Sequence, residues 1–238
     1  MVTAGSEEVM GNIGRTMSVL QYGDTLLPIG SFSFSNGLES AVQHRIVHDL
    51  ATLAQFTLTA VRRAATSDCI ALLQAHRAAC VADLDSVMAA DEAIFCRKLN
   101  EEARAMTVRM GRSLADVAVR VVEGPVLSRW RDEIARRNVP GTYPATLGVL
   151  FAELAAPEED AFSVHQYGVA MTTLSAALRL MRIEPVEVQM ILHDLNARVG
   201  EHYAAVRALS LSDMAGFAPA TDILAAMHTR AHVRMFMN

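Results

Sequence analysis

The chain has 238 residues, 52% of them hydrophobic and only 5% aromatic, and a formal net charge of −5. An apolar set made mostly of Ala, Leu, Val and Met favours helices over a β-sandwich. The negative charge, without a block of basic residues, argues against nucleic acid as the main ligand. No apolar run is long enough for a membrane span.

The beginning of the chain predicts a flexible tail over residues 1–17. Its first fifteen residues hold three glycines, Ser6 and the pair Glu7-Glu8, but no apolar stretch typical of a signal peptide. The rest, residues 18–238, shows no internal repeat or domain boundary. We therefore expect one folded domain after the tail.

The segment from Leu26 to Glu39 is unlike the rest of the chain. Pro28 and Gly30 break any helix, and serines then alternate with phenylalanines, which predicts apolar and hydroxyl groups on opposite sides. We call this segment the opening loop. An uncharged, aromatic-bearing loop indicates a surface kept for binding. A buried connecting loop is the equally supported alternative.

Helical patterns follow in order. Asp49 is placed as the N-cap of an amphipathic helix that begins at Leu50, and a second helix is expected from about Ser67 to Cys80. Caps for further helices are expected between Asp83 and Asp91. The longest pattern runs from about 91 to 122, with apolar residues at steps of three and four.

A break at 123–125 and a short helix through Ile134 lead to Thr142, the expected cap of the next helix. The helix through Phe162 to Met181 is apolar or small nearly all round, which predicts the centre of a bundle. Arg179 inside it must find a partner. A helix from Glu184-Pro185 is expected to run past residue 203, and a final one to start near Thr221. We predict an all-α, single-domain bundle of roughly ten helices.

No catalytic set or metal site emerges from residue spacing. Two His pairs at i, i+4 spacing, His44 with His48 and His228 with His232, lack the further ligands of a metal site, and surface histidines explain them more simply. The chain has no P-loop, and its one lysine, Lys98, lies far from any glycine-rich loop. The serines of the opening loop lack a nucleophile elbow. We therefore expect no cofactor.

The three cysteines are odd in number, widely spaced and set inside helical patterns: Cys69, Cys80 and Cys96. This usage is typical of reduced thiols in the cytosol rather than of disulfides or a zinc site. We expect a cytoplasmic protein.

Specific sequence motifs say more about this chain than these general patterns do. The run Leu27-Pro-Ile-Gly-Ser-Phe-Ser-Phe-Ser-Asn-Gly-Leu-Glu39 resembles the N-terminal signature of the UreF family of urease accessory proteins, Leu-Pro-Val-Gly-Gly-Phe-x-x-Ser-x-Gly-Leu-Glu. Ser31 replaces the second glycine. Four further matches follow in family order: Arg109 to Leu114; Tyr143-Pro144 with Gly148; Ser175 to Leu180 with Gln189; and Pro219 to Ile223 with His228 and Arg234-Met-Phe236. The resemblance covers roughly residues 18 to 238.

The resemblance departs from the family at two places besides Ser31. Tyr143 stands where the family usually has His, and Met181 to Gln189 replaces a Pro-x-Gly-Gln-like turn. Partner contacts at these positions therefore do not transfer directly.

The resemblance implies an all-α homodimer that is not an enzyme. Such proteins bind the accessory protein UreD, also called UreH, and recruit the GTPase UreG. The assembly docks on apo-urease, where nickel is inserted, and the family is thought to modulate GTP hydrolysis by its partner. The resemblance also implies a partner surface made of the opening loop and the C-terminal residues: Phe32, Ser33, Phe34, Ser35, Glu39, Arg179, His228, Arg234 and Phe236.

Two other classes of function stay open. One is an all-α enzyme whose catalytic groups converge only in three dimensions, suggested by eight scattered histidines and Glu39. The other is a regulatory module that binds a ligand in a pocket, suggested by the apolar loop and the 13 methionines.

Overall fold

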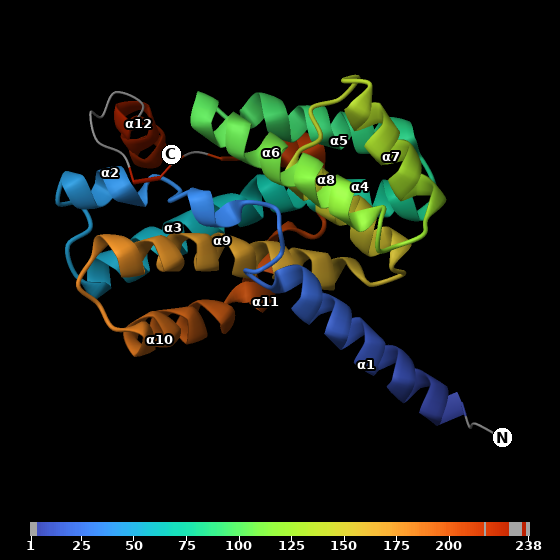
Figure 1. Ribbon diagram of the computed structural model, residues 1–238, viewed down its shortest axis with the longest axis horizontal. Coiled ribbons are helices and arrows are strands. Elements are labelled where there is room, and N and C mark those ends of the chain that lie inside the picture. The colour runs from blue at the N-terminus through green and yellow to red at the C-terminus, as the bar shows by residue number, and fades with distance from the viewer. Residues whose placement is uncertain (1–3, 217, 229–234, 237–238) are drawn as a thin grey trace.

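The protein is an elongated bundle of helices in the computed structural model, which describes residues 4–216, 218–228 and 235–236 (Figure 1). The predicted all-α class is confirmed, with no strand among these residues. In chain order the helices are α1 (Ala4–Gly23), η1 (Ser31–Ser33), α2 (Leu38–Gln43), α3 (Leu50–Thr66), α4 (Asp68–Cys80), α5 (Leu84–Arg97), α6 (Glu101–Ala118), α7 (Pro125–Ala135), α8 (Tyr143–Glu153), α9 (Glu158–Leu180), α10 (Pro185–Asn196), α11 (Val199–Val206), η2 (Leu211–Asp213) and α12 (Pro219–His228).

Several expected caps are present. The Asp49 carboxylate accepts from the backbone N–H of Thr52 at 2.8 Å, so α3 begins where the sequence predicted. Asp83 caps α5 in the same way. Thr142 precedes α8 but does not cap it with its side chain, because its hydroxyl instead donates to the buried carboxylate of Asp91.

Two predicted long helices are each divided in the structure. The pattern over 91–122 is interrupted after Arg97, because Asn100 caps a new helix through a 2.7 Å bond from the N–H of Ala103 to its side-chain oxygen. The expected helix through residue 203 likewise turns at Ala197-Arg198 before α11 begins. The described residues form twelve α-helices, where the sequence predicted roughly ten, and α1 and α2 are among those it did not predict.

The N-terminal residues form a helix that extends away from the bundle (Figure 1). The sequence predicted a flexible tail over residues 1–17, whereas the structure continues α1 back to Ala4. The helix is tied to α9 by an ion pair between Arg15 and Asp160, and Tyr22 at its end is buried in the main core. Its flexibility stays a prediction.

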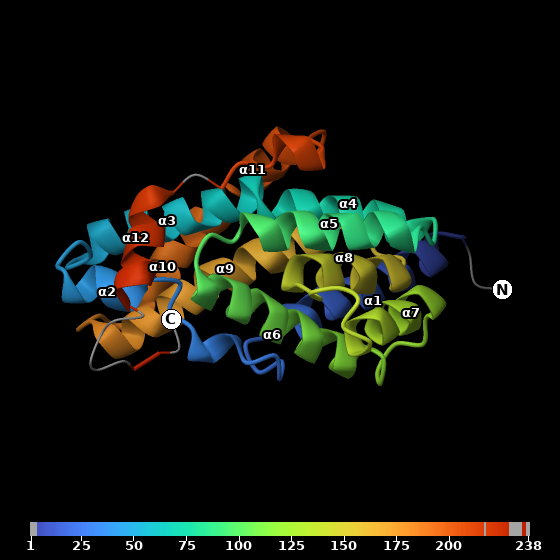
Figure 2. The ribbon, with the colours of Figure 1, turned by 90° about the horizontal axis from the view of Figure 1, so that it is seen from above.

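The helix α9 lies at the centre, as expected, in contact with α3, α4, α8, α1 and α10 (Figure 2). It borders two apolar cores. The larger core joins α4 to α8 and includes Leu72, Trp130, Phe151 and Phe162. The smaller core lies around α2, α3 and α10, and includes Leu38, Leu53, Leu174 and Phe236.

The crossing of α4 and α8 depends on a glycine. A Cβ atom at Gly148 would lie 2.5 Å from the backbone oxygen of Leu72, closer than a Cβ can approach. Only glycine permits this approach, and it holds α8 in the middle of the larger core. In the described part of the chain, no helix is long and apolar enough to cross a membrane.

Candidate functional site

The opening loop divides its two phenylalanines between solvent and core. Ser31 to Ser33 form a 3₁₀ turn rather than the extended strand that the alternation predicted. The Phe32 side chain is 68% exposed, whereas Phe34 is only 2% exposed. The prediction that apolar and hydroxyl groups lie on opposite sides is therefore wrong, because the turn changes the direction of successive side chains. The loop is partly displayed and partly buried.

The loop ends in a left-handed pair. Asn36 has a φ of 55° and Gly37 a φ of 82°, a conformation in which Asn and Gly are the favoured residues. The next residue starts α2. The buried Ser35 hydroxyl accepts from the backbone N–H of Glu39 at 3.4 Å, which attaches the loop to the first turn of α2.

The Glu39 carboxylate binds the end of the chain. One oxygen accepts from the N–H of Met235 at 2.8 Å and the other from the N–H of Phe236 at 3.0 Å. The Glu39 side chain is buried, and a buried carboxylate is costly unless it is hydrogen-bonded. Glu39 thus holds Met235 and Phe236, which we call the C-terminal segment, against α2.

Arg179, near the end of α9, contacts both the opening loop and the C-terminal segment. Its Nη2 donates to the carbonyl of Phe32 at 2.8 Å, and its Cζ lies 4.0 Å from the ring centroid of Phe236. The second contact is a cation–π interaction. The partner that Arg179 needs is therefore the opening loop on one side and the C-terminal segment on the other.

The structure brings together most of the residues that the sequence singled out for partner binding. Phe32, Ser35, Glu39, Arg179 and Phe236 are linked by the contacts above. Ser33 lies half-buried in the 3₁₀ turn, and Phe34 is in the interior. Arg234 and the His228 side chain lie outside the described residues. Their role in binding stays a prediction.

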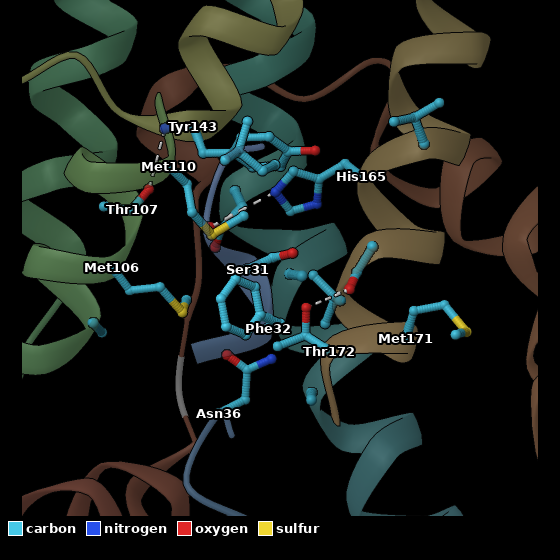
Figure 3. Close-up of a pocket in the computed structure, with 18 of the residues that line it drawn as sticks. Ser31, Phe32, Asn36, Met106, Thr107, Met110, Tyr143, His165, Met171 and Thr172 are labelled. Atoms are coloured by element: carbon cyan, nitrogen blue, oxygen red, sulfur yellow. Dashed lines mark hydrogen bonds and ion pairs between the residues drawn. The ribbon is translucent and has the colours of Figure 1, made fainter. Parts of the chain in front are cut away.

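Sequence reasoning missed a cavity of about 180 Å³ next to this loop (Figure 3). Ser31, Phe32 and Asn36 line one side, and residues of α1, α3, α4, α6, α8, α9 and α12 line much of the rest. At one end, the Lys98 ammonium donates to both oxygens of Asp68 at 2.6 and 2.8 Å. The signal in the sequence was the one lysine of the chain. It gave no sign of the acidic partner, which lies 30 positions away.

His165 also borders this cavity and is only 3% exposed. Burial lowers the pKa of its imidazole to about 4, so the ring is neutral near pH 7. Burial opposes ionisation of Asp68, but the neighbouring Lys98 charge outweighs it and leaves the pKa of the carboxyl below its usual value. The ion pair and the ring together carry no net charge.

The structure gives no support to a metal site at the candidate histidines. The Nδ1 of His44 lies 2.9 Å from the carbonyl of Ser40, and His48 is exposed beside Asp49. No three His, Cys, Asp or Glu side chains gather in metal-binding geometry within the described residues. His232 lies outside them.

Known proteins are similar to this chain over most of its length. The family model described as UreF matches residues 47–196, which span α3 to α10. The chain is 51% identical over 222 residues to urease accessory protein UreF 1 of Brucella melitensis biotype 1, over 93% of this chain and 92% of that protein. It is 44% identical over 227 residues to urease accessory protein UreF of Yersinia pseudotuberculosis serotype I, over 95% and 100% of the two chains.

Proposed function

The chain belongs to the UreF family of urease accessory proteins, and we propose that it acts by docking on other proteins through one composite surface. This surface comprises the opening loop, α2, the end of α9 and the C-terminal segment. The observation that carries the proposal is the shared attachment of loop and C-terminus to Glu39 and Arg179.

Phe32 is the residue on this surface best placed to bind a partner. Its side chain is exposed while its carbonyl is fixed by Arg179, so the ring is displayed from a held backbone. An exposed aromatic residue on a positioned loop loses little conformational entropy on binding and is typical of an interface hot spot. Met235 is exposed beside the buried Phe236 and extends the apolar area.

The partners that we propose are those of the family. The chain would bind UreD, also called UreH, and with it recruit the GTPase UreG to apo-urease for nickel insertion. In this scheme the protein is a homodimeric chaperone of the cytoplasm and modulates GTP hydrolysis by UreG rather than catalysing a reaction of its own.

Co-purification with UreD and UreG tests the surface. We expect deletion of residues 229–238 to abolish complex formation while circular dichroism shows unchanged helical content. We also expect Phe32→Ala to weaken the complex at least about tenfold, since hot-spot truncations cost 2 kcal/mol or more. Met190→Ala removes an equally exposed apolar side chain on α10 and serves as the control.

Two results would contradict the proposed docking surface. One is an intact complex after deletion of the last ten residues. The other is an equal effect of Phe32→Ala and Met190→Ala on binding.

A further inference from the structure

The cavity behind the opening loop has a polar end, apolar walls and further polar side chains along it, among them Ser31, Asn36 and Thr172 (Figure 3). The polar end holds Asp68, Lys98, Tyr143 and His165. The walls include Ile29, Met106, Met110, Val164 and Met171. A concave, mostly apolar space with a few converging polar groups is the usual form of a small-molecule site. Its volume of about 180 Å³ suits a ligand of a few heavy atoms.

The contacts of His165 fix which of its nitrogens carries the proton. The side-chain amide of Gln166 donates to the Cys69 sulfur at 3.3 Å, and that sulfur lies 3.5 Å from His165 Nδ1. Burial raises the pKa of the Cys69 thiol, so the sulfur keeps its proton, which we assign to the contact with Nδ1. The proton of the neutral imidazole is therefore on Nε2.

This Nε2–H faces an acceptor that it does not reach. The nearest carboxylate oxygen, Oδ1 of Asp68, lies 4.0 Å away, beyond hydrogen-bond distance. The Tyr143 ring lies against His165 with centroids 5.6 Å apart, and its hydroxyl has no hydrogen bond to any described residue. Beside the Lys98–Asp68 pair, the polar end thus presents the Nε2–H of His165, the Tyr143 hydroxyl and the Oδ1 acceptor of Asp68 to the cavity.

The charges of the residues that line the cavity limit which ligands it can bind. The Lys98 and Asp68 charges cancel, and Arg63, which also lines the cavity, is paired with Asp222 at 2.7 Å. Burial raises the pKa of Tyr143, so its hydroxyl stays neutral. A charged ligand would lose its hydration without gaining a counter-ion of its own. The head group that fits must therefore be neutral.

We propose that the cavity binds a small carboxamide with an aliphatic tail. A carboxamide offers a carbonyl oxygen and an N–H on adjacent positions. These match the Nε2–H donor of His165 and the Oδ1 acceptor of Asp68 across their 4.0 Å gap. The tail lies among the methionines, whose flexible side chains adapt to varied shapes. This inference does not depend on the proposed partner binding.

Four compounds with the same branched tail test the head group on the full chain: isovaleramide, isovalerate, isopentylamine and 3-methylbutan-1-ol. The protein is labelled with ¹³C at its methionine methyl groups and titrated by NMR. We expect saturable shifts at Met106, Met110 and Met171, but not at the exposed Met190. The amide should bind at least about tenfold more tightly than the other three. The carboxylate cannot donate to Asp68, the ammonium cannot accept from His165, and the alcohol must serve donors and acceptor through a single oxygen.

Two variants check the assigned donor. His165→Leu should weaken isovaleramide binding about tenfold or more, whereas His193→Leu, at an exposed histidine of α10, should leave it unchanged. If His165→Leu does not fold, the ranking of the four compounds on the native chain decides. The absence of saturable binding, an acid, amine or alcohol that binds as tightly as the amide, or equal shifts at Met190 would overturn the proposal.

Discussion

The guanidinium of Arg179 lies over the ring of Phe236, with Cζ 4.0 Å from the ring centroid. The two residues are 57 positions apart, one at the end of α9 and the other near the end of the chain. Because Arg179 also bonds the carbonyl of Phe32, it couples the opening loop to the C-terminal segment. Four changes test how this arrangement and the rest of the fold are stabilised.

The Glu39→Gln substitution should release the C-terminal segment. A glutamine side chain has one acceptor oxygen, so one of the N–H groups of Met235 and Phe236 would face an amide donor instead. The loss should be about 1–3 kcal/mol for that contact. Hydrogen exchange at these two amides is the measurement, and faster exchange is expected. Glu187→Gln, in the exposed cap of α10, is the control. Unchanged exchange in Glu39→Gln would show that the carboxylate does not hold the segment.

The Arg179→Leu substitution should loosen both the loop and the C-terminus. It removes a cation–π contact and a hydrogen bond at a partly solvated site, together worth about 1–2 kcal/mol. Limited proteolysis should show faster cleavage in residues 24–37 and near residue 235. Arg182→Leu removes an exposed arginine just beyond the end of α9 and should have little effect. Equal cleavage in the two variants would contradict the coupling.

The Gly148→Ala substitution should destabilise the larger core. The added methyl group would overlap the Leu72 carbonyl, so α4 and α8 must separate, at a cost of about 1–3 kcal/mol. Urea unfolding followed by circular dichroism measures the change. The matched change Gly200→Ala in α11 meets no atom within 4 Å and should be neutral or slightly stabilising. A Gly148→Ala protein as stable as the native one would mean that the helix crossing is less close than described.

The stability of the protein should decrease as the pH is lowered, partly because of His165. Burial lowers the pKa of this imidazole to about 4 in the folded protein, against 6.5 for a free histidine. Between these values the unfolded chain takes up a proton that the folded one does not, so the contribution is full above 6.5 and is lost as pH falls toward 4. The slope is up to about 1.4 kcal/mol per pH unit. Unfolding free energies of native protein and His165→Asn should therefore converge on acidification. A constant difference across this range would contradict a buried neutral ring.

Local sequence signals predicted much of the fold. Asp49 and Asp83 marked helix starts because a cap acts within three residues, and the apolar character of α9 placed it at the centre. The break before α6 was missed because the apolar period continues through it. The position of Lys98 there is set by Asp68 on another helix, a contact that no local pattern contains.

The candidate site was predicted only in part, because its contacts also join residues that are far apart in the sequence. The sequence predicted that Arg179 needs a partner because it lies in a helix that is apolar nearly all round. The groups that bind it depend on how the C-terminal segment packs against α2. The cavity depends on α4, α6, α8 and α9 at once, and its residues are far apart in sequence. His165 and Tyr143 therefore gave no sign of a shared site.

The central claim is that this chain supports urease maturation through its partners, and a reconstituted activation assay tests it most directly. Apo-urease, UreD, UreG, GTP, bicarbonate and nickel would be combined with and without the chain, and urease activity measured. We predict activity that depends on the native chain and is strongly reduced with the variant lacking residues 229–238. Equal activity in the presence and absence of the chain would contradict the account.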